Sequence, residues 1–416
     1  MSDVTAHSIT ACQVCGGLHL EPVLFLGHVP PVNAMVPVGE RPAQQNGYPL
    51  ELLRCIECGL VQIGCVVDPT VLFPHSYPYL SGTTRILRDN FADLYREVNG
   101  LLGLKPEDLA VDIGSNDGTL LANFHEAGHR VLGIEPSQAG DVARARGIAT
   151  HTGYFGPALA RSLAIEHGPA RVITACNVFA HMGDIHGIVD GIVEMLAPEG
   201  IFISENHYLG DLLRTVQYDT VYHEHLRYYA LGSVAKLLDS HGLEVFHVQR
   251  IPTHGGSIRV FSARKGQVPV QPSVAALYAE EEAAGITNGS ALAEFARRTR
   301  ASKLDLLALL APLKRDGARV YGIGAPSRAS TLITYTGLDE SIIDCVLEVS
   351  GSNKLDKYMP GTRIPVVEES KLFVDQPEYA LLLSWHIAEE IAANLRRKGF
   401  KGRFIAPLPE PRILSV

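Results

Sequence analysis

The sequence predicts an α/β fold in which a small cysteine-rich module precedes two units built from alternating strands and helices. Two C-x-x-C-G motifs begin at Cys12 and Cys55. A strand–helix alternation starts near residue 108, and a second, shorter one starts near residue 318. Such alternation is typical of a parallel sheet with helices on both faces, so we expect two Rossmann-like domains after the module.

Length and composition suit a chain of several domains. The chain has 416 residues, of which 46% are hydrophobic, and we expect domains at 1–75, 76–268 and 269–416. A formal charge of −9 without a basic run argues against nucleic acid as a partner. The first residues lack a basic segment followed by an apolar core, and no apolar run reaches the length of a membrane span. We therefore expect a cytoplasmic monomer that does not bind membranes.

The repeated C-x-x-C-G motif predicts a zinc site. The glycine after each second cysteine allows a sharp turn that points backbone N–H groups at a thiolate. A redox dithiol would need only one pair, and chance would not repeat the trailing glycine. Four thiolates fill a tetrahedral sphere, so this zinc would be structural. The expected ligands are Cys12, Cys15, Cys55 and Cys58.

The middle unit shows the strand pattern of a class I methyltransferase. Apolar strand segments alternate with helices, and two strands joined by a Gly-rich turn end the unit. The strand segments are 108–114, 129–136, 170–179 and 200–209, and the hairpin is 243–266. We interpret the pattern as five parallel strands followed by a hairpin, which is the order of a class I methyltransferase sheet.

The stretch "VDIGSNDGTLL" indicates a cofactor loop between a strand and a helix. Its glycines allow a ligand to approach the backbone, and Glu135, at the end of the next strand, can accept both hydroxyls of a ribose. The G-x-x-x-G spacing with Asp117 favours S-adenosylmethionine over NAD, because a carboxylate would repel a pyrophosphate but suits an ammonium group. Asp117 can also be a helix N-cap. The expected cofactor residues are Asp112, Gly114, Asn116, Asp117, Gly118 and Glu135, together with Asn177, Tyr77 and Ser81.

An irregular insert at 210–231 contains "TVYHEHLRYY". A zinc protease would need H-E-x-x-H, which this order does not give, and no third metal ligand is near. A polar surface helix remains an alternative. Proton chemistry is the third reading, because histidine titrates near neutral pH, Glu224 can orient it, and Tyr222 can hold a hydroxyl or an oxyanion. His181 follows the third strand segment at the edge where such sheets bind ligands, although a structural role for it is equally open.

The motifs together resemble the sugar C-methyltransferases of antibiotic biosynthesis, in particular those of tetronitrose biosynthesis. The resemblance rests on the two C-x-x-C-G motifs, called knuckles below, on the cofactor loop, and on "VYHEHLRYY", "THGGSIRV", "YGIGAPSRASTL" and "KYMPGTRIPV". It covers essentially the whole chain. It implies methylation at C-3′ of a dTDP-linked 4-keto deoxysugar, such as a 3-amino-2,3,6-trideoxy sugar, with S-adenosylmethionine and a structural zinc. It also implies that His225 is the base, with Tyr222, Glu224 and His181 around the sugar.

In that family the C-terminal domain helps to bind the nucleotide sugar. Here "GIGAPS", residues 322–327, ends a strand and begins a helix, where N–H groups favour anions. Relatives often show Ala-Lys-Gly where this chain has Ser-Arg-Ala at 327–329, which keeps a cation but changes its geometry. A plain turn and a solvated basic loop are the alternative. The expected substrate residues are Tyr222, Ser327, Arg328, Lys354 and Tyr358.

Two other functions fit parts of the pattern. A keto-sugar epimerase would form the same enolate without a methyl donor, but it has no need of the cofactor loop. A non-catalytic zinc protein that senses S-adenosylmethionine would have no need of the clustered His, Glu and Tyr residues.

Overall fold

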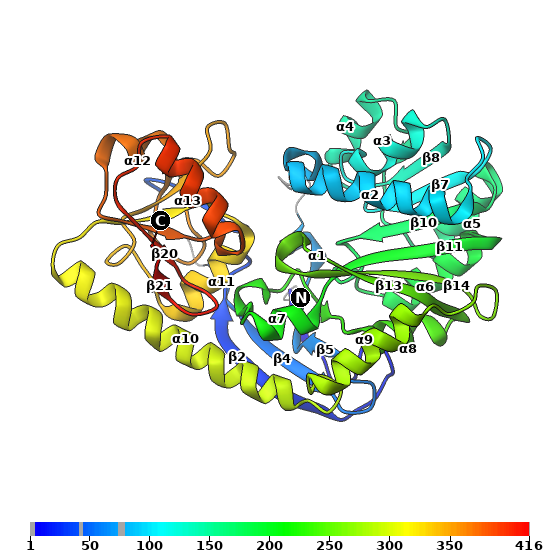
Figure 1. Cartoon of the computed structure of the whole chain (residues 1–416), viewed down its shortest axis with the longest axis horizontal. Coiled ribbons are helices and arrows are strands. Elements are labelled where there is room, and N and C mark those ends of the chain that lie inside the picture. Colours follow the sequence, from blue (N-terminus) through cyan, green and yellow to red (C-terminus); the bar gives the residue numbers. More distant parts are fainter. Residues whose placement is uncertain (1–4, 41–44, 74–79, 416) are drawn as a thin grey trace.

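The computed structural model describes residues 5–40, 45–73 and 80–415. The predicted cofactor residue Tyr77 lies outside these residues. In Figure 1 the N-terminal module, in blue, lies between the methyltransferase sheet on the right and the C-terminal domain on the left. Among the described helices, none combines the length and apolar character needed to cross a membrane.

The N-terminal module is built on an antiparallel sheet that borrows a strand from the insert. Its own strands are β2 (Leu20–Val29), β4 (Tyr48–Cys55) and β5 (Val61–Ile63), and β1 (Ala6–Ser8) pairs separately with β6 (Cys65–Val67). The edge strand β12 (Arg227–Tyr228) pairs with β5, with Arg227 opposite Gln62. The insert that carries the histidine motif is therefore joined to the module by backbone hydrogen bonds.

Within the described residues, the central sheet has seven strands in the order β13-β14-β11-β10-β7-β8-β9. The five strands from β11 to β9 are parallel to one another, and β14 is antiparallel to both β11 and β13. This is the predicted methyltransferase sheet with its terminal hairpin. The strands are β7 (Leu109–Ile113), β8 (Arg130–Ile134), β9 (Thr150–His151), β10 (Ala170–Cys176), β11 (Leu196–His207), β13 (Leu243–Ile251) and β14 (Ser257–Arg264).

Helices cover both faces of this sheet, each with its own apolar core (Figure 1). One face carries α2 (Arg85–Leu102), α3 (Thr119–Glu126) and α4 (Ala139–Ala145). The other carries α5 (Pro157–His167), α6 (Ile185–Met195) and α8 (Leu231–Asp239). Cys12, Val14 and Leu60 belong to this second core, so the cysteine knuckles pack on the same face.

The C-terminal sheet has the order β18-β16-β15-β19-β20-β21 among the described residues and is parallel except for β21. The helix α11 (Ser327–Thr336) follows its first strand and faces the insert. The other elements are β15 (Val320–Ile323), β16 (Cys345–Glu348), β18 (Val366–Glu368), β19 (Tyr379–Leu382), β20 (Arg403–Ala406), β21 (Arg412–Ile413), α12 (Ser370–Asp375) and α13 (Ala388–Arg397). The predicted Rossmann-like C-terminal domain is therefore present.

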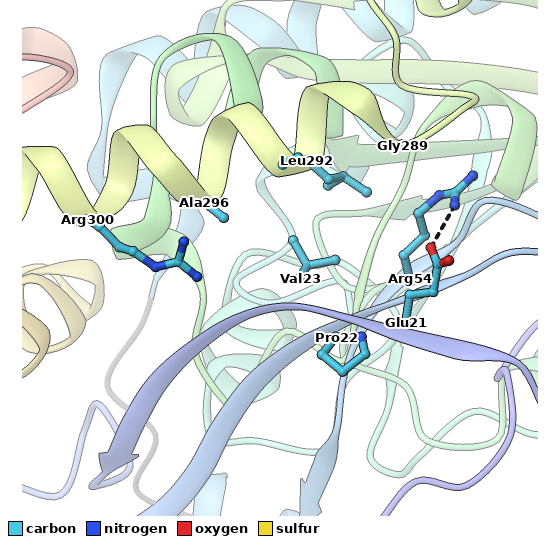
Figure 2. Close-up of a pocket in the computed structure, with 9 residues that line it drawn as sticks. Glu21, Pro22, Val23, Arg54, Gly289, Leu292, Ala296 and Arg300 are labelled. Atoms are coloured by element: carbon cyan, nitrogen blue, oxygen red, sulfur yellow. Dashed lines mark hydrogen bonds and ion pairs between the residues drawn. The ribbon is translucent and has the colours of Figure 1, made fainter.

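Several elements join the three units. Between the two parallel sheets come α9 (Pro272–Ala283) and the long α10 (Ser290–Arg315), which runs beneath the molecule in Figure 1. The N-terminus of α10 lies against β2 and β4, where Arg54 donates to the carbonyl of Thr287 at 2.8 Å and pairs with Glu21 at 3.1 Å. Figure 2 shows a cavity of about 300 Å³ at this junction. None of the predicted site residues is among the described residues that line it.

One further strand pairing and two short helices complete the description. The short strand β3 (Val36–Pro37) of the N-terminal module pairs with β17 (Lys357–Tyr358) of the C-terminal domain. The helices α1 (Pro69–Leu72) and α7 (Leu209–Arg214) precede the cofactor region and the insert's turn η2 (Tyr218–Thr220), respectively. The two outer units thus both hold the insert at the edge of the central sheet.

Candidate active site

The four cysteines of the two knuckles converge. Their sulfur atoms all lie within 4.8 Å of one another, and Cys12 faces Cys58 at 3.5 Å while Cys15 faces Cys55 at 3.5 Å. The trailing glycines Gly16 and Gly59 have φ values of 72° and 73°, which make the expected sharp turns. Four converging thiols in this geometry fit a tetrahedral structural zinc and leave no ligand position for a substrate.

The predicted cofactor loop lies at the carboxyl end of β7. Gly114 and Gly118 have φ values of 72° and 75°, and a Cβ on Gly114 would meet Val178 at 2.6 Å. The segment before α2 folds over this loop: the Ser81 N–H donates to Asn116 Oδ1 at 2.8 Å, and the Gly82 N–H donates to Asp117 Oδ2 at 2.9 Å. The structure thus brings Ser81 to the loop, as the cofactor prediction requires.

The Asp117 carboxylate is engaged within the protein. Its Oδ1 accepts from the Thr119 hydroxyl at 2.6 Å and from the Thr119 N–H at 3.3 Å, while Oδ2 holds Gly82. Arg146 lies 3.9 Å from Oδ2, and Asp117 is only 2% exposed. The N-cap residue of α3 is Gly118, so Asp117 is not the N-cap as the sequence alternative had it. Its carboxylate holds the first residue of α3 and the segment before α2 together.

Buried carboxylates line the same edge of the sheet. Glu135 follows β8 and accepts one N–H on each oxygen, from Asn116 at 3.0 Å and from Ser137 at 2.8 Å. Burial raises the pKa of Asp112 to about 7, a hydrogen bond from Thr174 opposes this, and the charges of Glu135 and Glu205 add to it. This acidic edge suits a ligand with hydroxyls and positive charges, such as S-adenosylmethionine, and disfavours a pyrophosphate.

His225 is held as a neutral imidazole in which one ring nitrogen is the hydrogen-bond donor and the other is the acceptor. Its Nδ1 donates to the Thr220 carbonyl at 2.9 Å, and burial, followed by His181, lowers its pKa well below the usual value. A neutral ring with its proton on Nδ1 presents Nε2 as a hydrogen-bond acceptor. The Tyr222 ring lies 4.1 Å from the His225 ring, centroid to centroid. The half-buried His225 therefore has the form that a general base needs.

His181 lies beside His225, with ring centroids 4.8 Å apart. Its Nδ1 donates to the Glu224 carbonyl at 2.6 Å, and burial lowers its pKa to about 4. The resemblance implies that His181 lies beside the reacting sugar, and this hydrogen bond decides which ring nitrogen faces the protein backbone. A neutral ring has one N–H, and here the Glu224 backbone takes it, so His181 offers an acceptor.

The Thr220 carbonyl orients the Nδ1 side of the His225 ring. The Glu224 carboxylate accepts from Asn33 Nδ2 at 2.8 Å, and Asn33 Oδ1 accepts from the Ser327 hydroxyl at 3.3 Å. One asparagine of the N-terminal module thus links the insert to the start of α11. Sequence reasoning missed Asn33, because it lies far from every motif in the chain.

The predicted substrate residues of the C-terminal domain separate into two groups. Lys354 donates to the Ala325 carbonyl at 2.6 Å, and burial lowers its pKa while Glu348 and Glu224 raise it, which places it on the Ser327 side. Tyr358 lies at the β3–β17 pairing, where its hydroxyl accepts from the Gly39 N–H at 3.5 Å. Of these two residues, Lys354 is the one whose pKa is affected by the Glu224 carboxylate of the insert.

Arg328 points away from this group and into the insert. Its Nε and Nη2 donate to the two oxygens of Asp219 at 2.7 and 2.9 Å, and Nη1 donates to His386 at 3.2 Å. At 7% exposure and with these donors engaged, it does not fit the phosphate-binding role expected from the sequence.

Other residues of the motif region point elsewhere. Asn177 has a φ of 57° and donates its N–H to the Glu205 carbonyl at 2.8 Å, which keeps it at the edge of the sheet near the cofactor loop. His223 is 1% exposed and donates from Nε2 to the Pro49 carbonyl at 3.2 Å, in the N-terminal module. Sequence reasoning also missed His207 and His254, whose charges act on His225.

Comparison with known proteins agrees with this arrangement. Residues 12–73 match a zinc binding domain family, residues 86–248 a methyltransferase domain family, and residues 252–409 the family described as C-methyltransferase C-terminal domain. The C-methyltransferase NovU of Streptomyces niveus is 36% identical over 421 residues, which cover 100% of this chain and 99% of that protein.

Solved structures resemble the chain only in part. The PH0226 protein of Pyrococcus horikoshii OT3 is 14% identical with a TM-score of 0.37 and covers 48% of this chain and 97% of its own. A SAM-dependent methyltransferase of Anabaena variabilis is 18% identical with a TM-score of 0.35 and covers 46% and 89%. No conclusion rests on these similarities.

The full-length relative is a C-methyltransferase, and two of the matched families are a methyltransferase domain and a C-methyltransferase C-terminal domain. These matches set aside both the epimerase and the non-catalytic alternative. The chain belongs to the S-adenosylmethionine-dependent C-methyltransferases that carry an N-terminal zinc-binding domain.

Proposed function

We propose that this C-methyltransferase acts on C-3′ of a dTDP-linked 4-keto deoxysugar, of the 3-amino-2,3,6-trideoxy class, and that His225 removes the C-3′ proton. The observation that carries the proposal is the state of His225. Its Nδ1 proton is held by the Thr220 carbonyl, so Nε2 is the acceptor of a neutral ring beside Tyr222 and His181. A carbon acid needs a positioned base of this kind before it can accept a methyl group.

The chemistry follows from the substrate class. A 4-keto group acidifies the hydrogen on C-3′, and removal of that proton by Nε2 gives an enolate whose charge lies largely on the keto oxygen. S-adenosylmethionine, when bound, supplies a methyl group on a positively charged sulfur. The Thr220 carbonyl stabilises the imidazolium that His225 becomes, because the Nδ1 hydrogen bond strengthens when the ring is charged.

Tyr222 and His181 have complementary roles in this proposal. Tyr222 donates to the keto oxygen as negative charge develops there. His181 accepts a hydrogen bond at Nε2, which suits an N–H of a C-3′ amino group. The two side chains both lie next to His225, with ring centroids 4.1 and 4.8 Å from it. An acceptor and a donor next to one base favour a sugar that carries both an amino and a keto group.

The nucleotide end of the substrate is proposed to reach Ser327 and Lys354. The hydroxyl of Ser327 connects through Asn33 to Glu224, and Lys354 lies within electrostatic range of the same carboxylate. A cation and the first turn of α11 suit a diphosphate, and Glu224 suits a sugar hydroxyl or amine. Glu135 and the loop from Gly114 to Gly118 would hold the ribose and methionine ends of the cofactor.

A first experiment tests the substrate and the base together. The protein is incubated with S-adenosylmethionine and a panel of dTDP-4-keto sugars, and mass spectrometry reports methylation. In deuterated water without the cofactor, the wild type should exchange the C-3′ hydrogen. His225→Asn should bind both ligands normally but lose turnover and exchange by a factor of about 100 to 10,000, which is typical of the loss of a general base.

His223→Asn is the matched control, because His223 is the neighbouring histidine of the same motif and faces Pro49. It should retain both activities. The base is misassigned if His225→Asn keeps wild-type turnover while Tyr222→Phe or His181→Asn abolishes exchange. The substrate class is wrong if no 4-keto sugar of the panel is methylated by the wild type.

A further inference from the structure

We infer that Arg328 of the C-terminal domain is a positioning residue for the base: through Asp219 it fixes the Thr220 carbonyl that holds the Nδ1 proton of His225. The inference rests on the proposed role of His225. In place of the phosphate contact expected from the sequence, Arg328 forms an ion pair with Asp219 inside the protein. Hydrogen bonds join Arg328 to Asp219 and Thr220 to His225, and the covalent backbone joins Asp219 to Thr220.

The first link is a fork-shaped ion pair in the interior. Arg328 Nε and Nη2 donate to the two carboxylate oxygens of Asp219 at 2.7 and 2.9 Å. Trp385 Nε1 donates to Asp219 Oδ2 at 2.8 Å, and the guanidinium lies 5.0 Å from the centre of the Trp385 ring. Asp219 is 0% exposed. A bidentate pair of this kind fixes direction as well as distance.

The second link is the backbone on both sides of Thr220. Asp219 precedes it, and Val221 follows it with a carbonyl that accepts from the Thr331 hydroxyl at 3.0 Å. Thr331 and Arg328 lie on the same helix, α11. The Thr220 hydroxyl also donates to the Gln217 carbonyl at 2.8 Å. Three consecutive residues are therefore anchored. Within the insert, the Thr220 N–H donates to the Gln217 carbonyl at 3.1 Å and the Tyr228 hydroxyl donates to the Thr220 carbonyl at 3.4 Å. The C-terminal domain fixes the residues on both sides of Thr220.

The third link is the tautomer of His225. A neutral imidazole carries one proton, and the acceptor that faces one nitrogen decides where it lies. The Thr220 carbonyl at 2.9 Å selects Nδ1. The groups that face His225 from neighbouring elements are the rings of Tyr222 and Tyr228 and the histidines 181, 207 and 254. None of these is a carboxylate that could take over the Nδ1 proton.

The arrangement has a consequence for substrate binding. Arg328 follows Ser327, which the proposed function places at the nucleotide end of the substrate. One turn of α11 would then contact the substrate and hold the base. Domain contact and proton removal would be coupled through two adjacent residues.

The test uses Arg328→Lys, which keeps the charge but loses the fork, and Trp385→Phe, which removes only the N–H to Asp219. Long-range proton–nitrogen spectra of the full-length protein with ¹⁵N-labelled histidine report the tautomer, and the His225 signals are assigned by their loss in His225→Asn. Arg319→Lys is the control, since Arg319 makes a similar bidentate pair with Glu378 on the exposed surface of the same domain.

We expect both variants to move proton density from Nδ1 toward Nε2 and to shift the acid limb of the kcat profile to lower pH, because the hydrogen bond to the Thr220 carbonyl raises the pKa of His225. We expect kcat to fall about ten- to a hundredfold with unchanged KM for S-adenosylmethionine, a loss typical of a displaced catalytic group. Arg319→Lys should change none of these. Unchanged Nδ1 signals in a folded Arg328→Lys overturn the inference, and Trp385→Phe decides in the same way if Arg328→Lys does not fold.

The two hypotheses fail separately. A shifted tautomer with wild-type exchange at C-3′ confirms the positioning role and contradicts His225 as the base. An unshifted tautomer together with an inactive His225→Asn contradicts the positioning role alone.

Discussion

Glu135 is a buried carboxylate whose two oxygens each accept one backbone N–H. An ionised carboxylate has about four acceptor sites, so each oxygen keeps capacity for another donor. The two N–H groups come from Asn116 in the cofactor loop and from Ser137 at the start of the next turn. The side chain is therefore preorganised to accept two neighbouring hydroxyls, as a ribose offers.

Glu135→Ala should weaken S-adenosylmethionine binding by about 1 to 3 kcal/mol, the range for hydrogen bonds to a charged group. Isothermal titration calorimetry measures this directly. Glu126→Ala, an exposed glutamate at the end of α3, is the control and should bind normally. Unchanged affinity in Glu135→Ala would remove this residue from the proposed cofactor site.

Single residues also show the limit of the sequence. The motif predicted which side chains would gather, and His225, His181 and Tyr222 do gather. It did not predict which atom each would use, because the partners that decide this are backbone carbonyls such as those of Thr220 and Glu224. The sequence also could not show the partner of Arg328, because Asp219 lies more than a hundred residues away in the chain. Arg328 was therefore expected to bind phosphate.

Among the elements, the long strands and amphipathic helices were predictable and the short ones were not. The buried strands β7, β8 and β10 fall in segments that the apolar pattern had marked, whereas β11 begins at Leu196, before the expected segment 200–209. The two-residue strands β9 and β12 carry too few residues for a pattern, and β12 exists only because β5 offers it an edge. The helix α5 was also missed, since only Ala160 and Leu163 of it are buried.

The pairing of β12 with β5 gives the zinc module an effect on the active site. Cys55→Ser should lose the metal, which would otherwise be about one zinc per chain, and unfold at a temperature lower by at least about 5 °C. Cys65→Ser, a buried cysteine of the same module outside the cluster, should keep its zinc.

Metal analysis and thermal unfolding measure both variants. Hydrogen exchange should also show weaker protection at Arg227 and Tyr228 in Cys55→Ser, because β12 depends on the module's sheet. A Cys55→Ser protein that loses its metal but keeps full stability would contradict a structural role for zinc.

Across the whole molecule, buried and half-buried histidines with lowered pKa values gather around the insert. Burial lowers the pKa of His181 and His223 to about 4 and of His207 and His386 to about 3. Each of these histidines has a pKa near 6.5 in the unfolded chain. At a pH between its folded pKa and 6.5, the unfolded chain therefore binds a proton that the folded chain does not, which favours unfolding. Their contribution to stability is complete above pH 6.5 and is lost as the pH falls toward 4.

The melting temperature should therefore fall steeply between pH 6.5 and 4. For His223, which is 1% exposed, the loss at pH 5 is about 2 kcal/mol, from about 1.4 kcal/mol for each pH unit below 6.5. His223→Asn should flatten the dependence relative to the wild type, and an exposed His19→Asn should not. Calorimetric scans across this range decide the point, and parallel curves for wild type and His223→Asn would refute it.

The contact between α11 and the insert also bears on how such enzymes can be redesigned. Exchanging C-terminal domains between relatives is a natural route to a new acceptor sugar. In this chain the exchange would also replace the partner of Asp219 and the hydroxyl that holds Val221. A hybrid would keep its catalytic speed only if the incoming domain brings an arginine and a threonine in the same register, so acceptor choice and turnover have to be selected together in recombination libraries.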